Sequence, residues 1–526
     1  MSDQPSFSRL RSYLWPIRGS ELRKFLPLVL MAFFIGFNYN ILRNMKDALL
    51  ITAESSGAEV LPFIKVWGIV PAALLMTFIY SRLNNKLRRD RVFQVMVAIF
   101  LGFFALFTFV IFPIRDLLHP HQLADHLQTV LPAGFKGLIA MFRYWTYSSF
   151  YIMSELWSST ILSMLFWGFA NEVTKLAEAK RFYGLIAMGL NLAAITSGVV
   201  SVFLTGEWLR GVFSICENPW HNSIVLLTSV VLLSGLAILG IYRYLTNSVF
   251  VGEEHADSVA SKKTAKIKLS MRESFAYLGR SKYLISIAVI VLSYNVVINL
   301  LEVIWKDSVR ELYPNPNNYN AYMSQITMIT GAISLFASLF LSGQLIRKMG
   351  WTFTALVTPV VLLLTSVGFF TFFFGGNALM GMVTVLGTSP LALVVFFGAA
   401  QNCLSRAAKF TLFDSTKEMA FIPLTVEAKL KGKTVIDGVG SRLGKSGGSL
   451  IHQTLLIVFT TISASAHIVA GILLAVGIFW IAAVMRLGKQ FNALTQKDPA
   501  MPATPAPATT EETEVVEAEE EVALTP

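Results

Sequence analysis

The chain has 526 residues, of which 54% are hydrophobic and only 14% are charged. An ordinary soluble chain carries about 25% charged residues. A mean hydropathy of +0.59 leaves too little polar surface for a water-soluble body of this length. The composition therefore excludes a soluble enzyme, a disordered chain and a small disulfide scaffold, and it predicts a polytopic membrane protein.

The net charge of +11 is unevenly distributed along the chain. Lys497 is the last basic residue, and one Asp and seven Glu follow it, so residues 1–497 alone carry +19. Two causes of this basic membrane domain remain open: Lys and Arg in the cytoplasmic loops, or a polyanionic cargo. The Pro-, Ala- and Glu-rich segment after Lys497 is predicted to be a disordered tail.

Apolar segments long enough to cross about 30 Å of hydrocarbon as helices recur twelve times. The predicted spans are 25–43, 60–80, 92–114, 138–172, 180–205, 222–245, 282–305, 321–346, 351–375, 378–412, 434–463 and 466–488. Three of them, the fourth, tenth and eleventh, exceed the length of a straight crossing and are expected to tilt, bend or project. The predicted fold class is an all-α membrane protein with twelve transmembrane helices.

Basic residues in the short connections predict the topology. They cluster in the N-terminal segment, in the loop 81–91 and in the connections after every second span, whereas the loops 375–377 and 463–467 contain no Lys or Arg. Cytoplasmic loops carry the excess of basic residues, so we expect both termini to be cytoplasmic. The first span is not followed by a small-residue, A-x-A-like cleavage site, so no cleaved signal peptide is expected.

Two sets of residues recur in the second half of the chain. Glu178, Gly189, Ser197 and Gly198 reappear 249 positions later, and Tyr39, Asn40, Asn44 and Asp47 correspond to Tyr294, Asn295, Asn299 and Glu302, 255 positions later. This pattern predicts two six-helix pseudo-repeats of the major facilitator type. The expected domains are a cytoplasmic N-terminus (1–24), a first bundle (25–246), a cytoplasmic linker (247–281), a second bundle (282–490) and a disordered acidic cytoplasmic tail (491–526).

Ionisable side chains within the spans require a reason, because each costs about 2.5–3.5 kcal/mol near the middle of a membrane. Glu155 and Lys445 stand alone, deep in their spans, while Lys46–Asp47 and Glu302–Lys306 end the first and seventh spans. One interpretation is that these charges pair and lock the two bundles together. The other is that Lys46 and Lys445 clamp an anionic substrate from opposite bundles. The acidic partners would then either hold the lysines when the site is empty or select a substrate by repelling extra negative charge. Unpaired, the two lysines would repel each other and impede reorientation of the empty protein.

Two further polar features stand out in the sequence. Asn191 lies in the fifth span, where its amide is suited either to a purine edge or to an interhelical hydrogen bond. His119, His121 and His126 lie in a polar outer loop without Cys or clustered carboxylates, so we expect solvated histidines there and neither a metal nor a cofactor.

Four stretches of the sequence together resemble one known family. They are LRNMKDALLIT (42–52), SELWSSTILSMLFWGFANEVT (154–174), NLLEVIWK (299–306) and KTVIDGVGSRLGKSGG (433–448). They are similar to the ATP/ADP translocases, the nucleotide transporters of obligate intracellular bacteria and plastids, and the similarity extends over residues 7–490. It implies a twelve-span antiporter that exchanges external ATP for internal ADP by alternating access, without hydrolysis. It also implies that the family's charged substrate-site residues fall on Lys46, Glu155, Glu302 and Lys445.

Other functions remain open at this stage. A proton-coupled nucleotide importer of broad specificity would use Glu155 or Glu302 to carry the proton. A membrane enzyme would need a catalytic constellation that the loops do not display, and a membrane scaffold would not need charges buried in its spans. The expected partners are ATP, ADP and the lipid bilayer, with no nucleic acid, and the protein is expected to be a monomer. A bacterial inner membrane is preferred over a plastid envelope.

Overall fold

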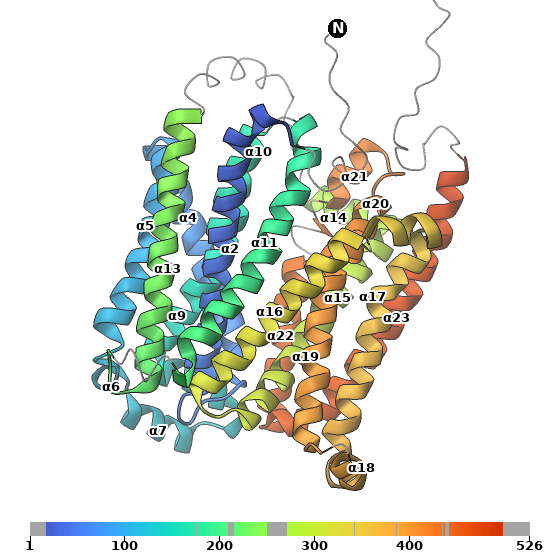
Figure 1. Cartoon of the computed structure of the whole chain (residues 1–526). Helices are drawn as coiled ribbons and strands as arrows, with labels where there is room; N and C mark the ends of the chain where they lie inside the picture. Colours follow the sequence, from blue (N-terminus) through green and yellow to red (C-terminus); the bar gives the residue numbers. More distant parts are fainter. Residues whose placement is uncertain are drawn as a thin grey trace, which may run out of the picture.

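The computed structural model describes residues 17–174, 176–208, 215–249, 271–340, 342–385, 387–433, 435–436 and 441–497. Over these ranges the regular structure consists of helices, and no strand occurs. Figure 1 shows long, roughly upright helices in two groups. We call the end where α2 begins the upper end and the opposite end the lower end, as in that view. Residues 1–16 of the expected N-terminus, 250–270 of the expected linker and 498–526 of the expected tail lie outside the described residues, so the predicted domain division stays a prediction. Residues 491–497 of the expected tail belong to the helix Ile462–Lys497, so the prediction of disorder is wrong for them.

The first half of the chain contributes the helices drawn from blue to green. Their bounds are η1 (Gly19–Glu21), α2 (Leu22–Ile51), α3 (Val60–Phe63), η2 (Ile64–Ile69), α4 (Val70–Lys86), α5 (Arg89–Leu106), η3 (Phe107–Ile111), α6 (Arg115–Leu118), α7 (His121–Val130), η4 (Ala133–Phe135), α8 (Lys136–Arg143), α9 (Trp145–Leu156), η5 (Trp157–Phe166), α10 (Trp167–Val173), α11 (Leu176–Thr205), α13 (Pro219–Tyr244) and η6 (Leu245–Val249).

The second half contributes the remaining helices, drawn from light green to red. Their bounds are α14 (Met271–Arg280), α15 (Lys282–Leu312), α16 (Pro316–Phe340), α17 (Ser342–Gly375), η8 (Gly376–Leu379), α18 (Met380–Val385), α19 (Pro390–Ala408), η9 (Lys409–Phe413), α20 (Asp414–Ala420), α21 (Val426–Lys433), α22 (Ser441–Phe459) and α23 (Ile462–Lys497). A kink interrupts α17 at Gly350, whose φ of 78° suits a residue without Cβ.

Local sequence signals start several of these helices. Asn218 precedes α13, and its side chain accepts hydrogen bonds from the backbone N–H groups of Trp220 and His221. Ser281 and Ser389 cap α15 and α19 in the same way. Such caps satisfy N–H groups that have no partner within the helix. Prolines occupy the first turn of α13 and of α19, where a missing N–H is tolerated.

The predicted fold class is confirmed, although not every expected span is one long apolar helix. Ten helices among the described residues are long and apolar enough to cross a membrane. The fourth expected span divides at Tyr144. Before it, α8 joins α6, α7 and η4 at the lower end, and we call these four helices (115–143) the cap. After it, a continuous helix runs from Trp145 to Val173, whose many Ser, Tyr and Trp residues lower its hydropathy. In the eleventh span, the apolar helix covers only Ser446–Phe459.

The tenth expected span also differs from the prediction. Residues 378–385 belong to η8 and α18 at the lower end, and the apolar span begins only at Pro390. Gly387, with a φ of 64°, lies at this break. A left-handed residue followed closely by a proline separates the two helices.

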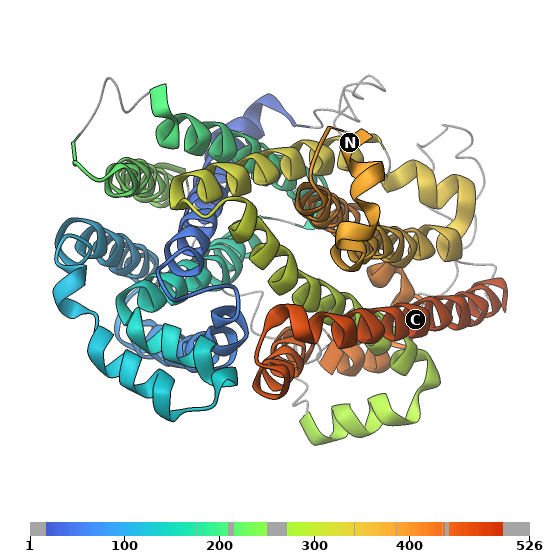
Figure 2. The same ribbon diagram turned by 90° about the horizontal axis from the view of Figure 1, so that it is seen from below.

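The two halves meet mainly along α11 and α16. These helices cross with glycines at the contact: a Cβ on Gly198 would lie 2.6 Å from the backbone oxygen of Ser324, and one on Gly331 would lie 2.9 Å from that of Asn191. Small residues let helices in a membrane approach this closely. Seen from below, most of the blue-to-green helices lie on one side and most of the yellow-to-red helices on the other (Figure 2).

The predicted internal repeat has a counterpart in the hydrogen bonds of α2 and α15. In α2 the Asn40 amide donates to the backbone oxygen of Gly36 at 2.8 Å, and in α15 the Asn295 amide donates to that of Val291, also at 2.8 Å. Both donors and both acceptors are displaced by the 255 positions of the repeat. The two helices therefore form the same side-chain-to-backbone hydrogen bond at equivalent positions of the repeat.

Candidate functional site

Two adjacent charged residues lie fully buried near the lower end of α2. Lys46 is 1% exposed and Asp47 is 0% exposed. The Lys46 ammonium lies 3.0 Å from Asp47 Oδ1 and 3.0 Å from Glu155 Oε1 in α9. It also lies 3.5 Å from the centre of the Tyr151 ring, which adds a cation–π contact. The first-half lysine is therefore held by two carboxylates and one aromatic face.

The second half supplies a further partner for Asp47. In α15, Glu302 and Lys306 are spaced i,i+4 and pair at 2.8 Å, as the first interpretation of the sequence predicted. The Lys306 ammonium, 1% exposed, also lies 2.8 Å from Asp47 Oδ2. Asp47 thus joins a lysine of its own helix to a lysine of the opposite half.

A third lysine, from the first half, contacts Glu302 in the second half. Lys65 in η2 donates to Glu302 Oε2 at 2.8 Å and to Asn299 Oδ1 at 2.9 Å, both in α15. The segment η2 has the wider turn of a π-helix, and a second π-helical segment, η5, begins two residues after Glu155. Such turns change the direction of the side chains around them and occur often at functional sites.

Together these contacts form one line of alternating charges between the two halves. We call it the charge chain, and its members in order are Glu155, Lys46, Asp47, Lys306, Glu302 and Lys65. Its middle is buried and its ends are more open, with Glu155 31% exposed and Lys65 18% exposed. Three carboxylates and three ammonium groups make the chain neutral overall.

One more cation lies beside the charge chain. Arg43 is in α2, three residues before Lys46, is 8% exposed, and lies in the electrostatic field of Glu302, Asp47 and Glu155. With Arg43 included, the site carries one excess positive charge. An anion that displaced the carboxylates from the lysines would find four cationic groups in one place.

The structure brings three of the five expected site residues together. Lys46, Glu155 and Glu302 all belong to the charge chain. Lys445 lies in α22, but its side chain is outside what the structure describes. Asn191 lies in α11 at the contact with α16, is half-buried, and its backbone oxygen faces Gly331. The expectation that acidic partners hold Lys46 agrees with these contacts, and Lys46 is paired in this structure.

The sequence alone assigned no part in substrate binding to three members of the charge chain. Asp47 and Lys306 stood out as charges in the membrane, and Lys65 did not stand out at all. Lys65 follows the apolar stretch VLPFI (60–64) near the start of its span, where a lysine is easily taken for one that reaches the interface. Only the spatial pairing with Glu302 distinguishes it from such a residue.

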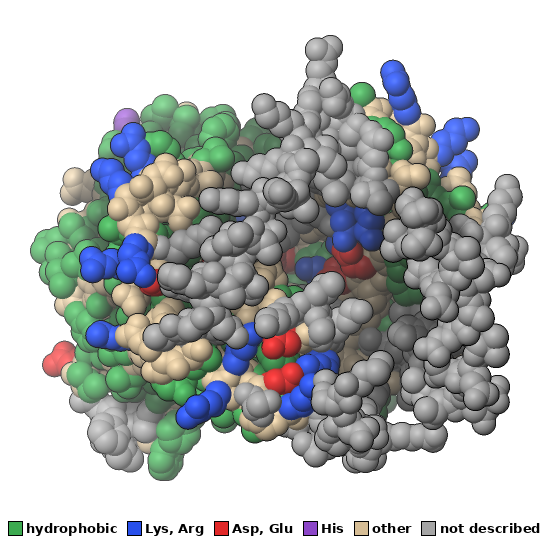
Figure 3. All heavy atoms as spheres, turned by 90° about the horizontal axis from the view of Figure 1, so that it is seen from above, with side chains coloured by type: hydrophobic (Ala, Val, Ile, Leu, Met, Phe, Trp, Pro, Cys, Tyr) green, Lys and Arg blue, Asp and Glu red, His purple; other side chains and the backbone are tan. Residues whose placement is uncertain are grey.

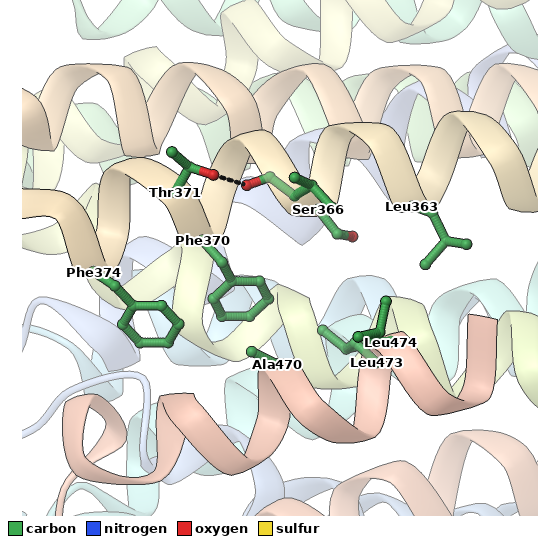
Figure 4. A pocket seen from close by; sticks show the side chains of 9 residues that line it. Leu363, Ser366, Phe370, Thr371, Phe374, Ala470, Leu473 and Leu474 are labelled. Carbon is green, nitrogen blue, oxygen red and sulfur yellow. Dashed lines mark hydrogen bonds between the residues drawn. The ribbon is translucent and has the colours of Figure 1, made fainter. Parts of the chain in front are cut away.

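The cavity between α17 and α23 is a different kind of space. Its volume is about 320 Å³. Figure 4 shows its lining residues, which are Leu363, Ser366, Val367, Phe370, Thr371, Phe374, Ala470, Leu473 and Leu474. None of these nine side chains is charged. A polyanion has no counter-charge there, so the charge chain is the better candidate site.

The outer-loop histidines differ from expectation in one respect. The loop folds into the helices α6 and α7, and His119 is only 6% exposed, with its Nε2 2.6 Å from Thr146 Oγ1 and its ring against the edges of Tyr144 and Tyr147. The prediction of solvated histidines is therefore wrong for His119. Burial, helped by the nearby His121, lowers the pKa of His119 to about 4. No group of three potential metal ligands occurs among the described residues.

Solved structures identify the class of fold. The nucleoside transporter NupG aligns with a TM-score of 0.51 at 13% identity, covering 89% of this chain and 99% of that one. The xylose transporter XylE of E. coli, solved in an inward-open conformation, aligns with a TM-score of 0.50 at 11% identity, covering 88% and 94%. The fold and the polar site between its halves define a polytopic membrane protein of the major facilitator type.

Sequence comparison identifies the family. The family model "TLC ATP/ADP transporter" matches residues 1–491. The chain is 49% identical over 501 residues to ADP,ATP carrier protein 2 of Chlamydia pneumoniae, covering 93% of each protein. It is 39% identical over 485 residues to the chloroplastic ADP,ATP carrier protein 2 of Arabidopsis thaliana, covering 92% of this chain and 77% of the relative. The chain belongs to the TLC ATP/ADP transporter family, which agrees with the resemblance found in the sequence.

Proposed function

We propose that this protein is an antiporter that exchanges external ATP for internal ADP by alternating access, without hydrolysis. The observation that carries the proposal is 49% identity, over 93% of both chains, to a protein named as an ADP,ATP carrier. A neutral charge chain with an additional arginine beside it supports an anionic cargo. The exchange requires no bond cleavage, so the site needs only to bind and release the nucleotide while the protein reorients.

The proposed location is the inner membrane of a bacterium, with both termini in the cytoplasm. The bacterial relatives support this location, and the basic residues of the alternate loops support the orientation. In this orientation the upper end of the molecule is cytoplasmic and the lower end faces outward. The protein is proposed to act as a monomer.

The proposed substrate contacts are Lys46, Glu155, Glu302, Lys445 and Asn191. Lys46 binds the phosphate groups from the first half, and Glu155 and Glu302 hold the lysines when no nucleotide is bound. Lys445 approaches the phosphates from the second half. Its position on α22 supports this role, because the flanking Gly444 and Gly448 lie against Asn295 and Asn299 of α15, and Asn299 accepts a hydrogen bond from Lys65. Asn191 contacts the base from the α11 side of the interface.

The charge chain provides a physical reason for obligate exchange. Opening the lower end separates Asp47 from Lys306 and Lys65 from Glu302, because each pair joins opposite halves. Leaving one member of a buried pair without its partner costs about 3–5 kcal/mol. Nucleotide phosphates that occupy the lysines reduce this cost, so the loaded protein reorients and the empty protein remains closed.

Exchange by the purified protein in vesicles tests the proposal. Vesicles preloaded with ADP are expected to accumulate labelled ATP at least about tenfold faster than empty vesicles, because the nucleotide offsets a barrier of more than about 1.4 kcal/mol. The label is expected to remain in ATP. Vesicles loaded with an unrelated anion such as citrate serve as the control. Equal uptake into empty and ADP-loaded vesicles would contradict obligate exchange.

Proton-coupled import of nucleotides with broad specificity is the alternative. Glu155 or Glu302 would carry the proton, and Glu155 is the more exposed of these two carboxylates. An uncoupler separates the two mechanisms: exchange through counter-transport persists when the pH gradient is collapsed at zero potential, whereas proton-coupled import stops.

A further inference from the structure

One face of α16 carries polar side chains along the contact between the two halves. Its members are Asn317, Asn320, Ser324 and Thr327, spaced i, i+3, i+7 and i+10. Residues with this spacing lie along one side of a helix. We call this row the polar seam. All four side chains are buried, with exposures between 0% and 8%.

Both ends of the polar seam bind the first half through hydrogen bonds. Ser223 in α13 donates its hydroxyl to Asn317 Oδ1 at 2.7 Å. Asn44 in α2 donates its amide to Ser324 Oγ at 3.2 Å and to Thr327 Oγ1 at 3.1 Å. The seam therefore faces α13 at one end and α2 at the other.

Asn320 lies between these bonded positions and differs from them. It is 1% exposed, and neither its Nδ2 nor its Oδ1 has a hydrogen bond to any residue that the structure describes. The adjacent Tyr319 is 0% exposed, and within the same described part of the chain its hydroxyl also lacks a partner. Most buried amides are satisfied, and an exception calls for an explanation such as a role in another state of the protein.

The polar seam lies next to the charge chain. Asn44 precedes Asp47 by three residues, so the seam and the chain are about one helical turn apart along α2. The Tyr319 hydroxyl lies in the electrostatic field of Asp47 and Glu302. Movement that separates Asp47 from Lys306 also separates the seam from α2, because both contacts join the same two halves.

The charge chain and the polar seam have complementary chemistry for the two parts of a nucleotide. The chain offers ammonium groups, which suit phosphates. Asn320 offers a donor and an acceptor in one plane, and the edge of adenine offers an acceptor nitrogen beside its amino group. The seam itself carries no charge, as suits a neutral base.

We propose that Asn320 binds the adenine edge of the nucleotide when the protein is open at its lower end. In the closed state its amide is buried between the halves, and opening exposes it to the entering cargo. The inference rests on the proposed nucleotide exchange and adds a specificity-determining residue to it. It differs from the role proposed for Asn191, which lies on the other half.

Base selectivity measured from the lower-end side tests the inference. The probes are ATP and ITP, which carry an amino group and a carbonyl, respectively, at the purine 6-position. Each is tested as an inhibitor of the uptake of labelled ADP. In Asn320→Leu and Asn320→Ala we expect the half-saturating ATP concentration at the lower-end face to rise about tenfold, the effect of losing one or two hydrogen bonds. The ratio of ITP to ATP inhibition constants is expected to fall toward one. In inverted vesicles, saturation by ATP from the upper-end side is expected to remain unchanged.

Asn317→Leu is the matched control, since Asn317 has the same side chain one turn away but has a partner in Ser223. This variant is expected to keep the wild-type ITP to ATP ratio and to unfold at a lower temperature, whereas Asn320→Leu is expected to unfold no earlier than the wild type. An unchanged ratio in both Asn320 variants, or an equal loss of ATP affinity at both faces, overturns the inference. Failure of the wild type to exchange nucleotides at all counts against the proposed function as well.

Discussion

The two ends of the molecule use ion pairs differently. At the upper end, Lys24 pairs with Glu178 at 2.9 Å and Arg181 with Glu21 at 2.6 Å, both within the first half. Another pair, between Lys433 and Glu418, lies within the second half. Figure 3, which views this end, shows Lys, Arg, Asp and Glu side chains close together near the middle of the face.

Toward the lower end, two ion pairs of the charge chain, Asp47–Lys306 and Lys65–Glu302, join the halves, and the first of them is more deeply buried than the upper pairs. Asp47 and Lys306 are 0% and 1% exposed, against 12% and 19% for Lys24 and Glu178. The cap reinforces this contact, because Gly134 in η4 lies against the backbone of Ile457 in α22. The comparison indicates that the upper pairs stabilise each half as a unit, whereas the charge chain sets the relative position of the two halves.

The largest expected difference in exchange activity is between two variants that each neutralise one carboxylate, one at the lower end and one at the upper end. Asp47→Asn removes a fully buried partner from Lys46 and Lys306, which is expected to cost about 3–5 kcal/mol and to reduce exchange more than about 100-fold. Glu178→Gln at the upper end is expected to change exchange less than about threefold, because partly exposed pairs contribute about 0–1 kcal/mol. Initial ATP uptake into ADP-loaded vesicles, at matched protein amounts, measures both. Equal losses in the two variants would remove the distinction between the ends.

A double-mutant cycle sharpens the assignment of Lys65 to the charge chain. Lys65→Met and Glu302→Gln each leave charge uncompensated, but the double variant removes both members of the pair. We expect a coupling of about 1–3 kcal/mol in thermal unfolding of the detergent-solubilised protein. Strictly additive effects would show that the 2.8 Å contact contributes nothing to the joining of the halves.

Disturbing the close packing of the cap against the second half is expected to have a moderate effect on closure of the lower end and on the exchange rate. In Gly134→Ala, the new Cβ would lie 2.5 Å from the Cα of Ile457, so the lower end closes less readily. We expect faster labelling of a cysteine placed at Leu456, which is 1% exposed in the closed lower end, and an exchange rate reduced about tenfold, typical of an overpacked contact worth about 1–3 kcal/mol. Gly168→Ala, with open space around its Cβ position, is the control and is expected to behave like the wild type. Identical labelling of the two variants would argue against closure at η4.

The smallest expected effect is a pH dependence within the cap. Because the pKa of His119 is lowered to about 4, the unfolded protein binds more protons than the folded one between about pH 6.5 and 4. Stability is therefore expected to fall as the pH drops through this window. His119→Gln is expected to reduce the slope of the unfolding temperature between about pH 7 and pH 5. A slope unchanged by the substitution would mean that other groups cause the dependence.

The sequence was sufficient for the fold class and for part of the site. Hydropathy and the repeat around Tyr39 and Tyr294 predicted the paired bundles, because apolar length and internal similarity are local properties of the chain. The excess length of the fourth and tenth spans predicted that they tilt, bend or project, but it did not place the breaks at Tyr144 and Gly387, since mean hydropathy averages over the residues that end a helix.

The sequence suggested that buried charges join the two halves, but which residues pair across them was beyond what it alone could predict. Lys65 and Glu302 are 237 positions apart, and no pattern in either segment indicates that they pair. Ser223 and Asn317 form a similar contact across 94 positions. The i,i+4 pair of Glu302 and Lys306 was foreseen because helix geometry alone brings the two side chains together.

The distance between the halves at the lower end tests the central claim most directly. Spin labels on Leu131→Cys and Val458→Cys, in a protein whose Cys216 and Cys403 are replaced by serine, report this distance by pulsed electron resonance. We predict one short distance without nucleotide, a second and longer distance when ATP is added, and the longer distance without nucleotide in Asp47→Asn. A single unchanged distance in all three samples would contradict the claim that the charge chain holds the lower end closed until an anion replaces its carboxylates.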